Sequence, residues 1–369
     1  MKTARTGRKR RWILLLCAIA FLGVAIMFSR RFYNPKSNKT VAFPVSMSPP
    51  MAQTIPKTSQ AFTRPDIAFA ESATKELAPI APIDARTVIK YGRNEGQLGM
   101  IRENGQTPVG PESFTLDSQG NILLADTVNH RMLVFSADGA YLRGITFSRH
   151  IPVNDIVLVG ANNFCVYDHM EHSLHLFDDK GALQQTLVLK PGDIDTRGYF
   201  HVVDGAVYFA DAAERDVLVA TFINGLLVPA DTSAIRMSNG IHSSSSRIYS
   251  VTLSRGTSVQ VEIQKSTSES RPLNVNIPLD HVVSAVFIGE DVEQNFYIQT
   301  EVIYENKVNL AIQIFNFVGV LQGAVKIAQN DYALWTSKLV MVTPSGDIVQ
   351  FIPQREQAQI CIYKKVTSL

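Results

Sequence analysis

Cysteine is scarce in this chain, which contains three cysteines among 369 residues. Cys17 lies in an apolar run near the N-terminus, whereas Cys165 and Cys361 lie in two β-rich segments far apart in the sequence. A disulfide requires the two Cα atoms to lie within about 7 Å of each other. Nothing in the sequence brings Cys165 and Cys361 together. We therefore predict that both are unpaired, buried apolar residues.

The sequence also lacks the short motifs that mark common enzyme classes. It contains no Gly-x-Ser-x-Gly elbow, no phosphate-binding loop and no dinucleotide-binding fingerprint. The net charge is only +2, and basic residues are concentrated in residues 1–11. The remainder therefore lacks the basic stripe that nucleic-acid binding requires. We expect no catalytic residue, no cofactor and no nucleic-acid partner.

One long apolar run is present, from Trp12 to Phe28, and it contains no charged residue. It is at the short end of what spans a bilayer as a helix. A cleaved secretory signal would require small residues where Met27 and Phe28 stand, and a lipidated Cys17 would require one in place of Leu16. We therefore predict an uncleaved signal anchor at 12–28.

Flanking charge sets the expected orientation of this span. Basic residues are denser before the run than after it, which places residues 1–11 in the cytoplasm as a basic tail. Residues 29–85 are rich in proline, serine and threonine and show no hydrophobic period, so we expect a disordered linker. About 50 flexible residues reach roughly 40 Å. The rest of the chain is then extracytoplasmic, and periplasmic in a bacterium with two membranes.

A repeat dominates the rest of the sequence. Asp126, Asp168 and Asp211 are spaced 42 and 43 residues apart, and Gly120, Asn162 and Gly205 precede them by six residues. These three residue types tolerate the positive φ of a tight turn. Each unit continues with a short apolar strand, a polar turn, a second apolar run and another glycine turn, at 139, 181 and 225. This period is typical of one propeller blade.

Weaker copies of the unit follow. They occupy 247–263, 295–319 and 345–363, which brings the number of blades to six in an all-β propeller over residues 86–365. The last unit lacks a fourth strand, whereas the β-rich run 86–91 precedes the first unit. We expect 86–91 to pair antiparallel with 359–363, because an unpaired edge would otherwise remain exposed.

The first unit resembles the NHL-repeat family. The resemblance rests on Asp117-x-x-Gly120, Ala125-Asp126, Asn129-His130-Arg131 and Asp138-Gly139. It implies a closed β-propeller that presents its loops for binding and only sometimes holds an active site.

Polar residues at the turns have two interpretations. His169, His172 and His175, with Asp168 and Glu171, suggest a metal cluster by composition. Alternation along a strand separates neighbouring side chains, so we predict no metal site there. We expect Asp126, Asp168 and Asp211 to cap turns within their blades rather than to act as acids or bases.

A second group lies where three inner strands begin. It comprises Glu112 with Ser113, Asn154 with Asp155, and Arg197 with Gly198. Six-bladed lactonases, which share this architecture, hold calcium at that position with Asn, Asp and Glu oxygens. Arg197 would instead pair with Glu112 or Asp155 and take the place of the ion, so we predict an ion pair.

Two functions follow from these expectations. The first is a membrane-tethered extracytoplasmic scaffold that binds another envelope protein or a glycan. The alternative is a metal-dependent hydrolase or lyase with calcium in the propeller channel.

Overall fold

The computed structural model describes residues 85–103, 106–190, 194, 198–231, 238–254, 258–265, 271–304, 307–330 and 336–365. The predicted tail (1–11) and span (12–28), and the linker (29–85) except its last residue, lie outside these ranges. Among the described residues, no helix is long and apolar enough to cross a membrane. The regular elements described are strands, which form six antiparallel sheets.

The first three blades follow the strong repeats. Their strands, innermost first, are β2 (Phe114–Leu116), β3 (Ile122–Asp126), β4 (Arg131–Phe135) and β5 (Tyr141–Thr146); β6 (Asp155–Val159), β7 (Asn163–Asp168), β8 (Ser173–Asp178) and β9 (Leu183–Val188); and β10 (Gly198–Val203), β11 (Ala206–Asp211), β12 (Arg215–Ile223) and β13 (Leu226–Pro229). A short fifth strand, β14 (Ser238–Asn239), pairs with β12.

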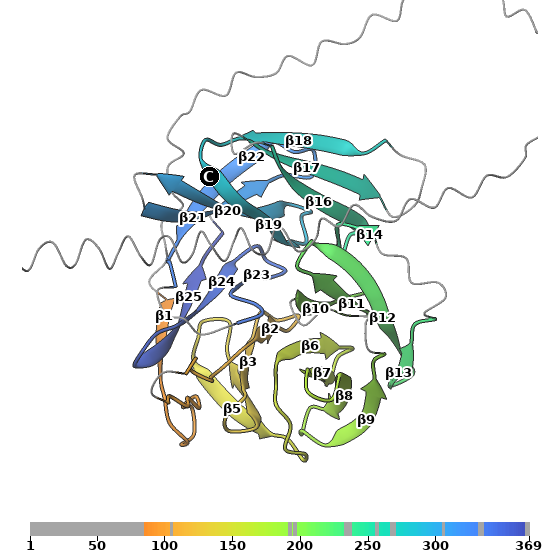
Figure 1. Cartoon of the computed structure of the whole chain (residues 1–369), viewed down its shortest axis with the longest axis vertical. Coiled ribbons are helices and arrows are strands. Elements are labelled where there is room, and N and C mark those ends of the chain that lie inside the picture. Colours follow the sequence, from red (N-terminus) through yellow and green to blue (C-terminus); the bar gives the residue numbers. More distant parts are fainter. Residues whose placement is uncertain are drawn as a thin grey trace, which may run out of the picture. The chain divides into compact units, whose positions relative to one another are not determined.

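The weak repeats form the other three blades. Their strands are β15 (Ile241–His242), β16 (Arg247–Ser254), β17 (Ser258–Lys265) and β18 (Leu273–Pro278); β19 (Val282–Glu290), β20 (Phe296–Tyr304), β21 (Lys307–Phe315) and β22 (Leu321–Ile327); and β23 (Val340–Val342), β24 (Ile348–Pro353), β25 (Gln357–Tyr363) and β1 (Ala85–Lys90). Inner strands of neighbouring blades contact each other, as β2 and β6 do. The predicted six-bladed all-β propeller is confirmed (Figure 1).

The first and last strands close the ring. β1 pairs antiparallel with β25, and Arg86 lies opposite Cys361 (Figure 1). Thr87 Oγ1 also donates a hydrogen bond to the Gly139 carbonyl in the first blade, at 2.9 Å. The pairing predicted from the unfinished last repeat is therefore present, with β1 beginning at Ala85.

Turn residues explain why the repeat folds as it does. Asp117 Oδ1 accepts hydrogen bonds from the backbone N–H groups of Gln119 and Asn121, and Gly120 completes the turn at φ +80°. The second blade differs from the prediction, because the positive φ belongs to Gly160 and not to Asn162. Its hairpin between β6 and β7 is built around a different residue of the turn.

Asp168 and Asp211 cap turns within their blades as predicted, whereas Asp126 bonds a backbone amide outside its own blade. Asp126 accepts hydrogen bonds from the Gly99 amide at 2.7 Å, from Asn129 Nδ2 at 2.8 Å and from Arg131 Nε at 2.8 Å. Asp168 and Asp211 accept bonds from amides of the turns that follow them. These carboxylates therefore satisfy backbone donors that would otherwise lack partners.

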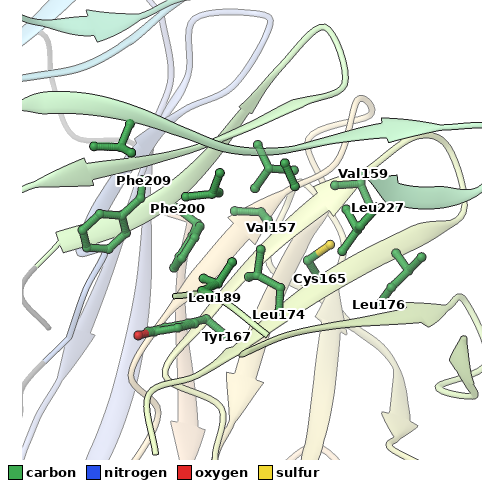
Figure 2. Close-up of a cluster of buried hydrophobic side chains, with 14 residues drawn as sticks. Val157, Val159, Cys165, Tyr167, Leu174, Leu176, Leu189, Phe200, Phe209 and Leu227 are labelled. Atoms are coloured by element: carbon green, nitrogen blue, oxygen red, sulfur yellow. The ribbon is translucent and has the colours of Figure 1, made fainter. Parts of the chain in front are cut away.

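Apolar side chains fill the spaces between blades. Figure 2 shows one such cluster, where side chains of β6, β7 and β8 meet Phe200, Phe209 and Leu227 of the third blade. Cys165 lies within it, and both Cys165 and Cys361 are free and buried, as predicted. Burial raises the pKa of the Cys165 thiol far above its usual range, so it stays protonated.

Candidate functional site: the propeller channel

The inner strands of the six blades surround a cavity of about 460 Å³. Each inner strand has a sheet partner on one side only, so its other edge faces the channel. Most of the lining is aliphatic or aromatic, and the ionisable side chains that reach it are Tyr199, His201, His242, Glu290 and Lys338. This mixture of apolar walls and a few polar groups is typical of small-molecule sites.

A polar group lies where β2 and β6 begin, next to Ser337 and Lys338 of the cavity lining. Asn154 Nδ2 donates a hydrogen bond to Glu112 Oε2 at 2.8 Å. Asn154 Oδ1 accepts from the His169 amide at 3.0 Å and also contacts His169 Nδ1. Burial raises the pKa of Glu112 to about 7, although the bond from Asn154 acts in the opposite direction. Glu112 is therefore substantially protonated near neutral pH.

A buried ion pair adjoins this group. Lys338 Nζ lies 2.8 Å from Asp155 Oδ1 and donates a further hydrogen bond to the Ile156 carbonyl at 2.8 Å. The two side chains are 7% and 3% exposed. Ser113 Oγ donates to the same carboxylate, and so does the Phe200 amide. Burial lowers the pKa of Lys338. The neighbouring Asp155 acts to raise this pKa, but burial is the larger effect, so the pKa lies below its usual value.

The structure brings Glu112 and Asn154 into contact and places Asp155 beside Ser113, but none of the three residues Glu112, Asn154 and Asp155 lines the cavity itself. Arg197, the predicted cation, lies outside the described residues. The described cation beside Asp155 is Lys338, which sequence reasoning missed. The sequence does contain a signal for this position of Lys338. Lys338 precedes the turn residue Gly346 by eight positions, as Glu112 precedes Gly120.

These groups do not fit a calcium site. Calcium prefers six to eight oxygen ligands with several ionised carboxylates. Here Glu112 holds its proton near neutral pH, and Asp155 already bonds an ammonium, a hydroxyl and an amide. A divalent ion would also lie beside the buried positive charge of Lys338.

A second polar cluster lies further along the channel, at the junction of the third and fourth blades. Asp216, whose side chain is fully buried, bonds His201 Nε2 through Oδ1 at 2.8 Å and His242 Nδ1 through Oδ2 at 2.9 Å. It also accepts from the His242 amide at 2.7 Å. Tyr208 stacks against both imidazole rings. Sequence reasoning did not single out these histidines, because they occur once each in unlike blades.

Burial alone would raise the pKa of Asp216, but hydrogen bonds from His201 and His242 outweigh it and hold the pKa below its usual value. The carboxylate is therefore ionised. Each imidazole directs one ring nitrogen at it and lines the cavity. This arrangement fixes the orientation of both rings.

The candidate metal cluster of the second blade is more compact than predicted. Ligand atoms of Asp168, Glu171 and His175 lie within 4.8 Å of one another. The prediction that alternation along the strand keeps these side chains apart is therefore wrong for His175. His172 instead occupies a positive-φ turn position, at +46°. Arg149 Nη2 binds both Glu171 oxygens, at 2.7 and 2.9 Å, and thus already supplies a positive charge there. Burial and Arg149 lower the pKa of His175.

The comparison with protein families agrees with the first repeat. The NHL repeat family matches residues 109–135, which cover the first repeat described above as far as Phe135. No curated protein matches the chain.

Several solved structures are similar in fold. Hydrazine synthase from Kuenenia stuttgartiensis is 9% identical, with TM-score 0.42 over 69% of this chain and 80% of that one. A DUF4221 protein from Bacteroides vulgatus is 8% identical, with TM-score 0.41 over 76% and 98%. Virginiamycin B lyase from Staphylococcus aureus is 11% identical, with TM-score 0.38 over 73% and 99%. Likenesses this distant carry no functional argument. The chain is thus an all-β six-bladed propeller with one recognisable NHL repeat.

Proposed function

We propose that this protein is a membrane-tethered propeller that works outside the cytoplasm as a docking scaffold for another envelope protein. The apolar run 12–28 and the linker 29–85 support the tether. One structural observation carries the docking role, namely an exposed apolar turn on the fifth blade. NHL propellers are a fold on which binding loops are commonly mounted.

The apolar turn connects β21 and β22 and consists of residues 316–320. Phe317, Val318 and Val320 are 53%, 50% and 56% exposed. The equivalent turn of the second blade has Asp179 and Lys180 where the fifth has Phe317 and Val318. Since both turns end in a glycine at positive φ, their backbones are alike and the apolar side chains are not required for folding.

A neighbouring turn extends the apolar surface. Phe296 lies opposite Phe315, so the turn before β20 and the turn after β21 lie at the same end of the sheet. The first of them carries Val292, which is 76% exposed. Clustered exposed apolar side chains are typical of protein interaction sites.

Several polar groups of the apolar turn bond one another within the turn. Asn316 Oδ1 accepts from the amides of Val318 and Val320, and the Asn316 carbonyl accepts from the Gly319 amide. A glycan would require free hydrogen-bonding groups beside an aromatic ring, which favours a protein partner here.

The start of β1, where the proposed tether would enter the propeller, lies on the same face as the apolar turn. Thr87, at the start of β1, bonds Gly139 in the turn between β4 and β5. That turn corresponds to the apolar turn in its own blade, since Gly139 and Gly319 hold the same position with φ +84°. A partner at or near the membrane surface is therefore accessible to the turn.

Exchanging the two turns tests the docking role. The double variant Phe317→Asp with Val318→Lys gives the fifth blade the turn residues of the second. We expect it to lose its co-purifying envelope protein after crosslinking while keeping the melting temperature of the unchanged protein. The reverse exchange at Asp179 and Lys180 is the matched control. Undiminished partner recovery from the double variant would contradict the proposal, and recovery of a glycan would replace the protein partner.

Topology is tested separately by cysteine labelling. In a Cys17→Ala background, Asp179→Cys offers an exposed thiol, whereas Cys165 and Cys361 are buried. A membrane-impermeant maleimide should label this variant on intact spheroplasts. Labelling only after lysis would place the propeller in the cytoplasm.

A further inference from the structure

The channel cavity holds two histidines that the scaffold role does not use. His201 and His242 belong to the inner strands of adjacent blades and both line the cavity. Both bond the same buried carboxylate, Asp216, through one ring nitrogen each. A shared, ionised acceptor fixes which nitrogen of each ring carries the proton. In the neutral form of each ring, the remaining nitrogens, Nδ1 of His201 and Nε2 of His242, are then hydrogen-bond acceptors.

Charge on the cavity wall is compensated by partners within the protein. Among the described lining residues, Lys338 is paired with Asp155, and Glu290 with Arg247 at 3.1 Å. The negative charge of Asp216 is stabilised by the two imidazole N–H donors. A charged ligand would have to give up its hydration without gaining an unpaired counter-charge. The cavity therefore favours an uncharged ligand.

The rest of the lining sets the remaining chemistry. Leu116, Leu158, Val286 and Met341 are among the aliphatic residues that line the wall. The volume of about 460 Å³ lies within the range of small-molecule pockets. An apolar body would bury against these side chains, and a hydroxyl could donate to an imidazole nitrogen.

We propose that the channel binds a small, uncharged organic molecule with an apolar body and a hydroxyl group, which donates its hydrogen bond to the His201–Asp216–His242 cluster. This site is separate from the docking turn and does not depend on it. The cluster also joins two blades, since Asp216 accepts from the His242 amide of the next blade. A purely structural clasp is the competing explanation, and ligand binding distinguishes the two.

Three matched probes test the proposal on the full chain in detergent micelles. 4-Methylphenol is uncharged near neutral pH, as the tyrosine side chain is. 4-Methylanisole has the same ring without the donor, and 4-methylbenzoate carries a charge. We expect 4-methylphenol to bind about five- to tenfold more tightly than 4-methylanisole, the value of one hydrogen bond. Equal binding of these two, tighter binding of 4-methylbenzoate, or no binding at all would overturn the proposal.

Histidine variants locate the site. His201→Phe and His242→Phe each retain a ring to stack on Tyr208, and at least one of them should abolish the preference for 4-methylphenol, whereas His150→Phe should leave it unchanged. A preference that survives in both His201→Phe and His242→Phe would overturn the assignment. Because these variants could fail to fold, histidine ¹³C resonances of the unmodified protein are followed as well. Those of His201 and His242 should shift with 4-methylphenol, and unchanged resonances would contradict the proposal.

Discussion

Asp155 and Lys338 form a buried ion pair, 2.8 Å between Oδ1 and Nζ, that joins the second blade to the segment leading into the sixth. Both side chains are nearly inaccessible to solvent. Removing one partner of such a pair leaves an uncompensated buried charge. The pair therefore links distant parts of the ring beside the channel cavity.

The first prediction concerns this pair. Lys338→Met should lower the free energy of unfolding by about 3–5 kcal/mol, because Asp155 would remain buried without its cation. Urea denaturation of the full chain measures it. Lys364→Met is the control, since Lys364 is 34% exposed in its pair with Asp347 and should cost at most about 1 kcal/mol. Equal losses of unfolding free energy in the two variants would show that the buried Asp155–Lys338 pair contributes no more to stability than the exposed pair.

The second prediction concerns pH. Glu112 has its pKa raised from 4.5 to about 7 in the folded protein, so the folded state holds this proton more tightly than the unfolded chain. Its contribution to stability is therefore complete below about pH 4.5 and is lost as the pH rises to about 7. Glu112→Gln should flatten this decline in urea midpoints, whereas Glu356→Gln, at an exposed site, should not. An unchanged pH profile in Glu112→Gln would refute the assignment.

The third prediction separates two equivalent aspartates. Asp126 is completely buried and forms an ion pair with Arg131. Asp211 instead pairs with Arg215, which is 46% exposed. Asp126→Ala should cost about 3–5 kcal/mol. Asp211→Ala should cost about 1 kcal/mol, because a surface pair contributes little. Thermal unfolding of both variants tests this ranking of the two stability losses. A common catalytic role for Asp126 and Asp211 would not produce such a difference.

Ring closure gives the fourth prediction. Within β1, Ile89 is 2% exposed and Val88 is 49% exposed, so adjacent residues face opposite sides of the sheet. Ile89→Ala should lower stability by about 2–5 kcal/mol. Val88→Ala should change it by no more than about 0.5 kcal/mol. A single cooperative transition shifted as a whole in Ile89→Ala would show that β1 belongs to the ring. Loss of only a local signal would contradict this.

The repeat made the fold predictable because each blade uses the same local turn chemistry. Asp117 and Gly120 define a turn through contacts within five residues, and such contacts can be identified from sequence. The last repeat unit lacked a fourth strand. The pairing of β1 with β25 could therefore be expected from the sequence.

The channel was only partly predictable, because its contacts join residues far apart in the chain. Glu112, Asn154 and Asp155 could be aligned by repeat register, but the sixth blade lacks the anchoring aspartate, so Lys338 was not aligned with them. His201 and His242 meet through Asp216, and nothing in the repeat relates these three positions. The apolar turn was visible in the sequence, but only its exposure in the structure separates it from buried apolar segments.

Site-specific photocrosslinking in intact cells tests the docking scaffold most directly. Benzoylphenylalanine at position 317 reports on the apolar turn, and the same group at position 179 reports on the equivalent turn of the second blade. We predict a discrete protein adduct from position 317 that is absent from position 179 and disappears when Val320→Asp is added. The same adducts from both positions, or none from position 317, would contradict the scaffold proposal.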